Sequence, residues 1–462
     1  MRVVAIGGSD AGISAALRVR ELDSGAEVMV VVADAYPNFS ICGIPYHVSG
    51  DVPDWHRLAH RTIADLEATG MQLLLDTVVE RVDADAHQLH ARGNTGQMHR
   101  IPYDALVIGT GAVPVRPPID GLEELGPAEG VHVLHSMDDT FAVMRSLTTN
   151  APRRAVIIGA GYIGLEMAEA LVSRGLAVTQ VEQLPEVLPT VDPELGRLVA
   201  AELRARGVEV ITGTAVKRIS RGRTSGAPAL VVEGGSPNGA TISREADVVL
   251  VFAGVRPDAA LAADAGVRLG VRGAIEVDRQ MRTNLEDVFA AGDCVVTHHR
   301  LAGVTYIPLG TTAHKQGRVA GENALGGQRE FAGSLGTQVV KVFDMAVART
   351  GLRDHEALSS GYDPVTVAAE ADDHKAYYPG SHRIVMRWTG DRRTGRLLGV
   401  QLFGHRHAEV AKRIDIAAAA IFNEMTVEAL SDLDLSYTPP LGSPWDAMQI
   451  GAQTWVRATR SA

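Results

Sequence analysis

The chain has 462 residues, which is too long for one hydrophobic core, so we expect roughly three domains. Hydrophobic residues make up 46% and charged residues 21% of the sequence, as is ordinary for a folded, soluble enzyme. The net charge of −11 argues against a nucleic acid or an anionic membrane as a partner, because phosphate binding needs clustered lysine and arginine.

Targeting and disulfide signals are also missing from the sequence. Met1 leads directly into a strand-like run without a signal peptide, and no apolar run of about 18 residues predicts a membrane span. The two cysteines, Cys42 and Cys294, lie far apart, which excludes a disulfide framework and favours a reducing, cytoplasmic compartment. Since no histidine cluster accompanies them, we predict no metal site.

The N-terminal third has the pattern of a strand, a glycine-rich turn, a helix and a second strand. Arg2–Ile6 and Glu27–Val32 are apolar and strand-like, and Ile13–Leu22 has helical spacing of apolar residues. The turn has the first and third glycines of the dinucleotide fingerprint, and Ser9 replaces the second at little cost in space. The residues predicted to hold a dinucleotide here are Gly7, Gly8, Ser9, Ala11 and Gly12.

Two acidic residues near this turn leave more than one interpretation open. Asp34 lies two residues beyond the usual ribose-binding place, so it is either a ribose ligand or a solvated loop residue. Asp10 begins the helix and is most simply a helix cap. A carboxylate beside a bound pyrophosphate is electrostatically unfavourable, however, so a proton-transfer role for Asp10 also stays open.

The same organisation returns with strands at Arg154–Ile158 and Ala177–Val181 and a helix at Leu165–Ser173. Its turn has all three fingerprint glycines, which allow a tight turn, close approach to pyrophosphate and close packing of helix on strand. These glycines are Gly159, Gly161 and Gly164. Glu182 ends the next strand, where it would bind ribose hydroxyls and repel a 2′-phosphate, so NADH is favoured over NADPH.

The remaining sequence predicts connections and a third domain. Val113–Pro118 is proline-rich and is typical of a linker, and Arg221–Arg244 is expected to form a loop or a hairpin. From about Gly336 the pattern changes to an α+β order. The expected elements are strands at Gln338–Phe343, Ile384–Trp388 and Leu397–Phe403, and a helix near Val410–Asn423.

One further motif resembles a known family. Thr283–Asp293 is similar to the second flavin motif of the pyridine nucleotide–disulfide oxidoreductases, a buried strand that delivers the carboxylate of Asp293 to the ribityl hydroxyls. Within this family the chain is most similar to the single-cysteine branch: coenzyme A disulfide reductases, NADH oxidases, NADH peroxidases and persulfide reductases. The resemblance covers nearly the whole chain. It includes the crossovers at Tyr103–Gly111 with Pro114 and at Gly254–Pro257, and the start of a dimerisation domain at Gly336–Leu352.

The resemblance implies an α/β fold with two Rossmann-like dinucleotide-binding domains and a C-terminal α+β dimerisation domain. Residues 1–116 and 257–325 would bind FAD, residues 117–256 would bind NADH in preference to NADPH, and residues 326–462 would form a homodimer. Further cofactor contacts are implied at Thr110, Gly111, Gly254, Gly292, Asp293, Tyr162 and Ile163.

Cys42 is the candidate redox residue. The run from Cys42 to Tyr46 matches the cysteine segment of the single-cysteine branch, and Pro45 suits the first turn of a helix. A helix N-terminus beside the thiol would lower its pKa and favour the thiolate. No second cysteine follows four or five residues later, so Cys42 would cycle through a mixed disulfide with a small thiol or through sulfenic acid. The alternative is a buried structural cysteine.

The sequence departs from the family at two places near Cys42. The residue before Cys42 is the apolar Ile41, and Asp10 occupies the position at which the oxidase and peroxidase branches have a histidine. The missing histidine lowers the expectation of peroxidase activity.

The resemblance also assigns roles to residues outside these motifs. Glu166 would face the nicotinamide and Tyr162 would cover the flavin, although both are also ordinary helix residues. Thr311 and Thr312, before a helix at Ala313–Leu325, would aim a helix N-terminus at the flavin pyrimidine. Tyr378 and Tyr437 would come from a partner subunit, where a hydroxyl could protonate a leaving thiolate, or they are simple interface residues.

The sequence therefore predicts an FAD-dependent NAD(P)H oxidoreductase that reduces a small disulfide or persulfide, similar to a coenzyme A disulfide reductase. Two alternatives remain. The first is an NADH oxidase or peroxidase that works through a cysteine sulfenic acid, and the second is an NADH-sensing electron-transfer flavoprotein. The expected partners are a small thiol or disulfide substrate and a second copy of the chain. If the protein is similar to a coenzyme A disulfide reductase, the substrate is derived from coenzyme A.

Overall fold

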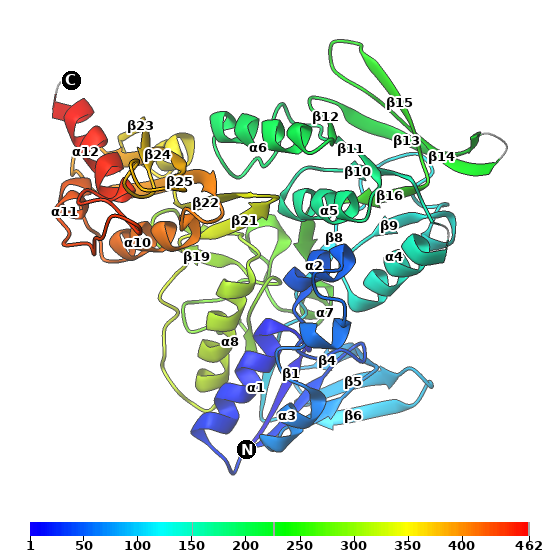
Figure 1. Ribbon diagram of the computed structural model, residues 1–462. Helices are drawn as coiled ribbons and strands as arrows, with labels where there is room; N and C mark the ends of the chain where they lie inside the picture. Colours follow the sequence, from blue (N-terminus) through cyan, green and yellow to red (C-terminus); the bar gives the residue numbers. More distant parts are fainter. Residues whose placement is uncertain (150, 225–226, 461–462) are drawn as a thin grey trace.

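The computed structural model describes residues 1–149, 151–224 and 227–460, and in this part of the chain three five-stranded sheets dominate the fold. Figure 1 shows the sheet with the N-terminal strand at the bottom, the second sheet at the upper right and the third at the left. The expected combination of two Rossmann-like sheets and a C-terminal α+β unit is confirmed.

The first sheet is parallel and has the order β18-β7-β1-β2-β3. Its strands are short and apolar because both of their faces are buried. They are β1 (Arg2–Ile6), β2 (Glu27–Val31), β3 (Gln72–Leu74), β7 (Ala105–Ile108) and β18 (Val288–Ala290).

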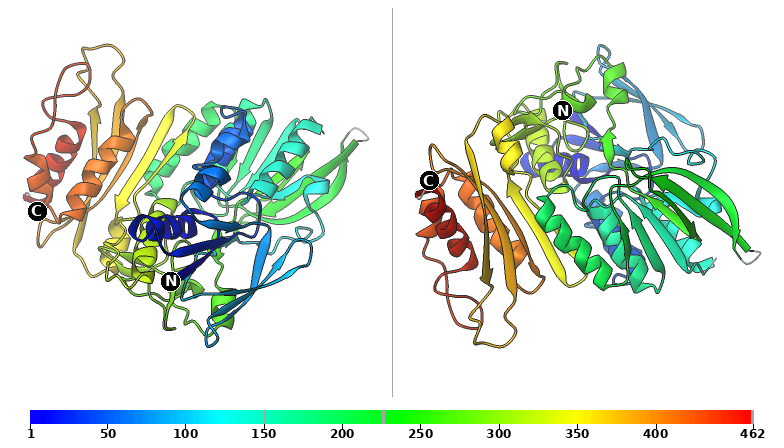
Figure 2. Two further views of the ribbon diagram at one scale, coloured as in Figure 1. Left: turned by 90° about the horizontal axis from the view of Figure 1, so that it is seen from below. Right: turned by 90° about the horizontal axis from the view of Figure 1, so that it is seen from above.

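Two helices, α1 (Asp10–Leu22) and α8 (Gly310–Ala324), pack closely together beside this sheet (Figures 1 and 2). Glycines on α8 permit the short separation. A Cβ added to Gly317 or Gly321 would lie 2.3 Å from a backbone oxygen of Ala11 or Ala15. As a result, the N-termini of both helices lie side by side at the end of the sheet.

The second sheet is also parallel, in the order β12-β11-β10-β16-β9. Its strands are β9 (Val131–Val133), β10 (Arg154–Ile158), β11 (Ala177–Val181), β12 (Glu209–Ile211) and β16 (Val248–Val251). Its helices are α4 (Met137–Thr149), α5 (Tyr162–Ser173) and α6 (Pro193–Ala205).

Two strands connect these units. β8 (Ala112–Pro114) pairs antiparallel with β17 (Val255–Pro257), so the predicted linker at Val113–Pro118 begins as a strand of a two-stranded crossover. The predicted hairpin within Arg221–Arg244 is part of an antiparallel arm, which projects at the upper right of Figure 1. The arm consists of β13 (Ala215–Thr224), β14 (Ala227–Gly235) and β15 (Thr241–Ala246), and its residues 225–226 lie outside the described part.

The third sheet is antiparallel, in the order β21-β22-β25-β24-β23, and it is covered by C-terminal helices. The strands are β21 (Gln338–Val342), β22 (Met345–Gly351), β23 (Pro364–Asp372), β24 (Arg383–Asp391) and β25 (Leu397–His405). The helices are α9 (Asp354–Ser359), α10 (Val410–Phe422), α11 (Val427–Ser431) and α12 (Ala447–Arg460).

The remaining elements are short. They are α2 (Ile44–Ser49), α3 (Ile63–Ala68), α7 (Ala260–Asp264), the hairpin β19 (Thr297–His299) with β20 (Gly303–Thr305), and the antiparallel strands β4 (Thr77–Asp83), β5 (Gln88–Gly93) and β6 (Met98–Pro102). Single 3₁₀ turns occur at Ile41–Gly43, Trp55–Leu58, Pro127–Glu129 and Val271–Gly273.

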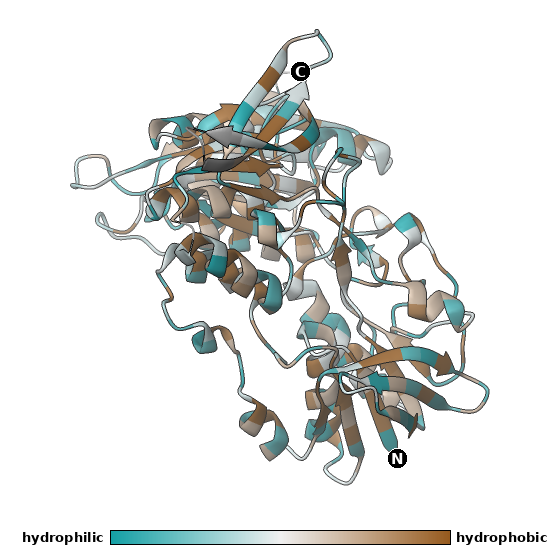
Figure 3. Cartoon of the chain, turned by 90° about the vertical axis from the view of Figure 1, so that its right-hand side faces the viewer, coloured by the Kyte–Doolittle hydropathy of each residue, from teal (hydrophilic) through white to brown (hydrophobic). Residues whose placement is uncertain are grey.

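The short helix α2 shares a hydrophobic core with the second unit. Ile44 and Val48 of α2 are buried in the same core as Leu165 of α5 and Val340 of β21. Figure 3 shows hydrophobic residues concentrated on strands and on the buried faces of helices. The segment after β2 is therefore anchored where the three units meet. In the described part of the chain, no helix is long and apolar enough to cross a membrane.

Candidate active site

The turn between β1 and α1 places Asp10 at the start of two helices. Ser9 is the N-cap residue of α1 and Asp10 is the first helical residue, so the prediction that Asp10 caps the helix is wrong. The Asp10 side chain points to α8: its Oδ1 lies 3.3 Å from Nε2 of His314, and a Cβ on Gly310 would lie 2.7 Å from its Oδ2. Burial raises the pKa of Asp10, while the charges of His314 and His60 oppose this effect.

The second flavin motif leads to the same place. α8 begins at Gly310, so Thr311 and Thr312 lie in its first turn and not before the helix, as the sequence suggested. Asp293 follows β18, and burial, then the charge of Asp10, raises its pKa to about 6. Asp293 is thus a largely desolvated carboxylate beside two helix N-termini.

These residues fit FAD. Two adjacent helix N-termini favour its pyrophosphate, and Asp293 can accept hydrogen bonds from its ribityl hydroxyls. Asn38 lies beside the turn, where its N–H donates to the Gly8 oxygen at 2.6 Å. The buried Oδ1 of Asn38 has no hydrogen-bond partner among the described residues, so it is available to a ligand donor. Among the described residues, no atom lies within 4 Å of a Cβ built on Gly111, which leaves space beside this backbone.

Three of the other predicted cofactor contacts are held by the chain itself. Asp34 is half-buried and accepts a hydrogen bond from Tyr36 N at 2.9 Å, and burial raises the pKa of its carboxyl. Thr110 Oγ1 donates to the Asp258 oxygen at 2.5 Å. Gly254, with φ of 91°, accepts from Val115 N at 2.9 Å in the crossover.

The second nucleotide turn has the geometry that its glycines predict. Gly161 is the N-cap residue of α5, and a Cβ there would meet nothing within 4 Å, which leaves the backbone open to a ligand. A Cβ on Gly164 would lie 2.3 Å from the Gly159 oxygen, so helix and turn are in close contact. Glu182 is buried, and its carboxylate accepts from Ala160 N at 2.7 Å and Leu184 N at 2.8 Å.

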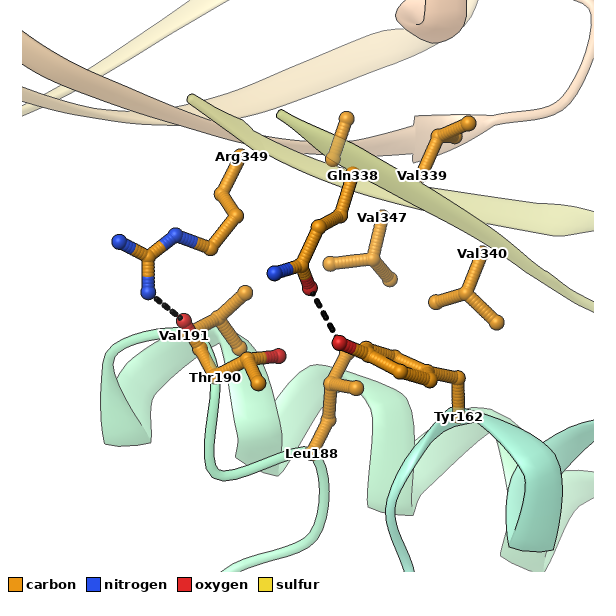
Figure 4. Close-up of a pocket in the computed structure, with 10 residues that line it drawn as sticks. Tyr162, Leu188, Thr190, Val191, Gln338, Val339, Val340, Val347 and Arg349 are labelled. Carbon is orange, nitrogen blue, oxygen red and sulfur yellow. Dashed lines mark hydrogen bonds between the residues drawn. The ribbon is translucent and has the colours of Figure 1, made fainter. Parts of the chain in front are cut away.

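Tyr162, the first residue of α5, points toward the third sheet (Figure 4). Its hydroxyl donates to Gln338 Oε1 of β21 at 2.8 Å, and Arg349 of β22 donates to the Thr190 oxygen at 2.7 Å nearby. Ile163, the next residue of α5, is exposed. To cover the flavin by rotating its ring, Tyr162 would have to break the hydrogen bond to Gln338.

Cys42 lies in the 3₁₀ turn Ile41–Gly43 directly before α2, and Pro45 occupies the first turn of α2 as predicted. The residue is exposed, so the alternative of a buried structural cysteine is wrong. Cys294, by contrast, is fully buried and contacts the backbone oxygens of Ala291 and Ile108, which agrees with a packing role.

The predicted lowering of the thiol pKa by the helix dipole is wrong. Although Cys42 is exposed, the atoms packed around its thiol partly desolvate it, which raises its pKa. The negative charges of Glu166, Asp10 and Asp293 raise this pKa further. The helix that follows has only six residues, and desolvation together with three nearby carboxylates gives a net rise of the thiol pKa. The chain alone therefore favours the protonated thiol.

Glu166 belongs to a polar group on the other side of Cys42. Tyr46, one turn after Cys42, donates its hydroxyl to Glu166 Oε1 at 3.2 Å. Burial raises the pKa of Glu166 to about 7, against the hydrogen bond from Tyr46. Glu169 on the same helix forms an ion pair with Lys341 and accepts from Phe343 N at 2.8 Å.

Tyr378 and Tyr437 are exposed on loops of the C-terminal unit. Their loops meet where Lys375 N donates to the Pro439 oxygen at 3.4 Å. In Figure 1 the C-terminal helices α11 and α12 lie apart from α2, and no hydrogen bond or ring contact among the described residues joins either tyrosine to Cys42 of the same chain. In the described residues, no cluster of three or more histidine, cysteine, aspartate or glutamate residues has the arrangement of a metal site.

Sequence reasoning missed two residues of this site, His314 and Tyr46. Tyr46 had a local signal, because it follows Cys42 by four residues and α2 repeats every 3.6 residues. His314 had no signal, since its position beside Asp10 depends on the packing of α8 on α1.

Comparisons with known proteins agree with this geometry. Residues 1–317 match the family described as pyridine nucleotide-disulphide oxidoreductase, and residues 337–448 match its dimerisation domain. An NAD(P)H sulfur oxidoreductase (CoA-dependent) from Pyrococcus furiosus is 35% identical over 98% of both chains. An NADH oxidase from Methanocaldococcus jannaschii is 31% identical over 98% of both.

A solved structure shows the same similarity. The NAD-dependent persulfide reductase from A. fulgidus has a TM-score of 0.92 and 37% identity, and the match covers 100% of this chain and 84% of that one. The chain therefore belongs to the pyridine nucleotide-disulphide oxidoreductase family and is an enzyme that uses FAD and NAD(P)H.

Proposed function

We propose that the protein uses NADH to reduce a small disulfide or persulfide, and that Cys42 is the sulfur that reacts with this substrate. The observation that carries the proposal is an exposed, unpaired cysteine at the place where α2 joins the first nucleotide unit to the second. A lone thiol there can exchange with a substrate sulfur, but it has no neighbouring cysteine with which to form its own disulfide. A reducing, cytoplasmic compartment suits such a thiol.

FAD, when bound, supplies the passage of electrons from NADH to the sulfur. The residues of the turn after β1, together with Asp293 and the first turn of α8, would hold it. The turn after β10 and Glu182 would hold NADH. Within the chain, Cys42 would attack the substrate, and one sulfur would leave while the other stays bound to Cys42 as a mixed disulfide. Cleavage of that bond by two electrons returns Cys42 and a second thiol.

The finer assignments belong to the same proposal. Glu166 would face the nicotinamide, and Tyr378 and Tyr437 of a second copy would protonate the leaving sulfur. A homodimer is needed for this, and residues 326–462 would form its interface. The names of the relatives favour a substrate derived from coenzyme A, because one is CoA-dependent and another is a persulfide reductase.

The test is a Cys42→Ser variant, with Cys294→Ala as the matched control. We expect Cys42→Ser to abolish NADH-driven reduction of coenzyme A disulfide and of a persulfide, while NADH-driven reduction of an artificial dye survives. Dye reduction needs only the flavin and NADH. Cys294→Ala removes a thiol that takes no part, so it should keep both activities. Equal loss of both reactions in Cys42→Ser, or no loss of either, would contradict the proposal.

A second candidate function is an NADH oxidase in which Cys42 cycles through a sulfenic acid. The relative named NADH oxidase favours it, as does the imidazole of His314 beside Asp10. Oxygen consumed in proportion to NADH, without stimulation by disulfides, would select this function. A protein bleached by NADH that stays bleached in air would instead select the electron-transfer flavoprotein.

A further inference from the structure

In the proposed function, the tyrosines of a second copy protonate the sulfur that leaves when Cys42 attacks the substrate, but no residue supplies a proton to the second sulfur, which leaves when the mixed disulfide at Cys42 is reduced. Reduction of a disulfide by NADH consumes one proton from solvent, because two thiols form while NADH contributes one hydrogen. When two electrons cleave the mixed disulfide, each sulfur becomes a thiolate. The thiolate that departs as product needs a proton. Some group near Cys42 must carry that proton in from water.

A histidine–aspartate pair stands beside this site. His314 Nε2 lies 3.3 Å from Asp10 Oδ1, and His314 Nδ1 lies 2.9 Å from Ser14 Oγ. The Asp10 side chain is only 24% exposed, whereas that of His314 is 44% exposed. The pair therefore has an inner end at Asp10 and an outer end in contact with water. The hydrogen bond between the Ser14 hydroxyl and Nδ1 fixes the orientation of the His314 ring.

The inner end lies beside the segment that carries the reactive sulfur, because the N–H of Asn38, four residues before Cys42, donates to the oxygen of Gly8, two residues before Asp10, at 2.6 Å. The charge of Asp10 is one of the three that raise the pKa of the Cys42 thiol, and it also raises the pKa of Asp293. Asp10 therefore stands on the turn that contacts the Cys42 segment, and its charge reaches the thiol.

The titratable groups that face Asp10 are His314 and His60, whose charges lower the pKa of Asp10. The His60 ring lies 6.3 Å from the His314 ring. Farther along the same two helices the charges compensate one another: Arg18 pairs with Glu322 and Glu21 at 2.6 and 2.9 Å, and Arg318 pairs with Glu21 at 3.1 Å. Lys315, next to His314, donates to the Thr311 oxygen at 3.0 Å.

We infer that Asp10 and His314 form a proton relay that exchanges protons between solvent and the sulfur chemistry at Cys42. The relay rests on the proposed function for its substrate. When the mixed disulfide at Cys42 takes two electrons from NADH, its bond breaks and the departing thiolate takes the proton of Asp10. His314 then passes its own proton to Asp10 and regains one from water. His314 is in this sense a positioning residue, because it acts through Asp10.

The relay predicts a particular loss in His314→Gln. The rate of coenzyme A disulfide reduction at neutral pH should fall about tenfold, because a lost proton donor typically costs ~10²-fold or more and water replaces the donor in part. In the wild-type enzyme kcat should decrease as pH rises and the relay loses its proton, and this decrease should disappear in the variant. Added imidazole should restore part of the rate, and KM for NADH should stay unchanged.

A second readout does not depend on turnover. In Asp10→Asn the thiol loses one of its negative neighbours, so its pKa falls and more thiolate is present at a given pH. We expect iodoacetamide to alkylate Cys42 of the FAD-loaded variant at least about threefold faster at neutral pH than in the wild type, measured by mass spectrometry of the Cys42 peptide.

The matched control is Glu322→Gln, which removes another link between α1 and α8 without touching the pair. It should keep the wild-type pH profile and alkylation rate. Unchanged alkylation in Asp10→Asn, or a His314→Gln enzyme with the wild-type pH profile and no response to imidazole, would overturn the relay. A wild-type enzyme that reduces no disulfide would remove the proposed function alone, since the alkylation comparison still decides whether Asp10 acts on Cys42.

Discussion

At the scale of single residues, the site depends on where carboxylates stand relative to one sulfur. Cys42 was identifiable from its local sequence, and so was the proline that begins α2. Its electrostatic surroundings were not identifiable. Desolvation raises the pKa of the Cys42 thiol, and the charges of Glu166, Asp10 and Asp293, which come from distant parts of the chain, raise it further, against the predicted lowering.

Glu182 carries a prediction about nucleotide choice. Its carboxylate lies at the second nucleotide turn, where it would repel a 2′-phosphate, and the next residue, Gln183, is exposed. We expect Glu182→Ala combined with Gln183→Arg to move the ratio of kcat/KM for NADPH over NADH upward by about 100-fold, since a repulsion is replaced by a charge-assisted contact. Steady-state kinetics with both nucleotides measure this ratio.

The control for this change is Glu182→Gln, which removes the charge but keeps an oxygen for Ala160 N or Leu184 N. It should give an intermediate ratio. If the double variant keeps the wild-type preference while retaining its fold, the carboxylate does not select the nucleotide.

At the scale of elements, most helices and strands could be predicted from local patterns. β1, β10 and β11 have the bounds that their apolar runs indicated. Helix starts were less well predicted. α1 and α8 each begin three residues earlier than expected, because Asp10, Gly310 and Thr311 lack the apolar spacing on which the prediction relied. This difference moved Asp10 from a capping position into the first turn.

The close contact of α1 and α8 carries a prediction about stability. A Cβ on Gly317 would lie 2.3 Å from the oxygen of Ala11, which belongs to the first nucleotide turn. We expect Gly317→Ala to destabilise the protein by about 1–3 kcal/mol and to weaken FAD retention, because the helices must separate at the turn. Thermal unfolding and the ratio of flavin to protein absorbance measure the two effects.

Lys315→Ala is the control on the same helix, because Lys315 is exposed and is not at one of the glycine positions that touch α1. It should change neither quantity by more than a small amount. A Gly317→Ala protein with wild-type melting temperature and full flavin content would show that the two helices separate without cost.

At the scale of the whole molecule, the site is incomplete in one chain if the tyrosines act on the sulfur. Tyr378 and Tyr437 are exposed on loops of the C-terminal unit, and no hydrogen bond or ring contact among the described residues joins them to Cys42 of their own chain. A symmetric dimer places the same surface of each chain against the other, so each chain would donate its tyrosines to its partner.

Hybrid dimers test this arrangement. We would mix equal amounts of Cys42→Ser chains and chains with both Tyr378→Phe and Tyr437→Phe, then let the subunits exchange. About half of the dimers become hybrids with one complete site each, so about a quarter of the wild-type disulfide reductase activity should return. Activity no greater than the average of the two parents would mean that each chain uses its own tyrosines or none.

The sequence by itself determined the two nucleotide turns, the position of the candidate redox cysteine, the α+β C-terminal unit and the family resemblance, because each depends on residues close together in the chain. Only the tertiary structure decided what surrounds Cys42. His314 and Asp10 are about 300 residues apart, and they meet because glycines on α8 allow it to approach α1. A contact of this kind depends on helix packing, and no local pattern of residue types records it.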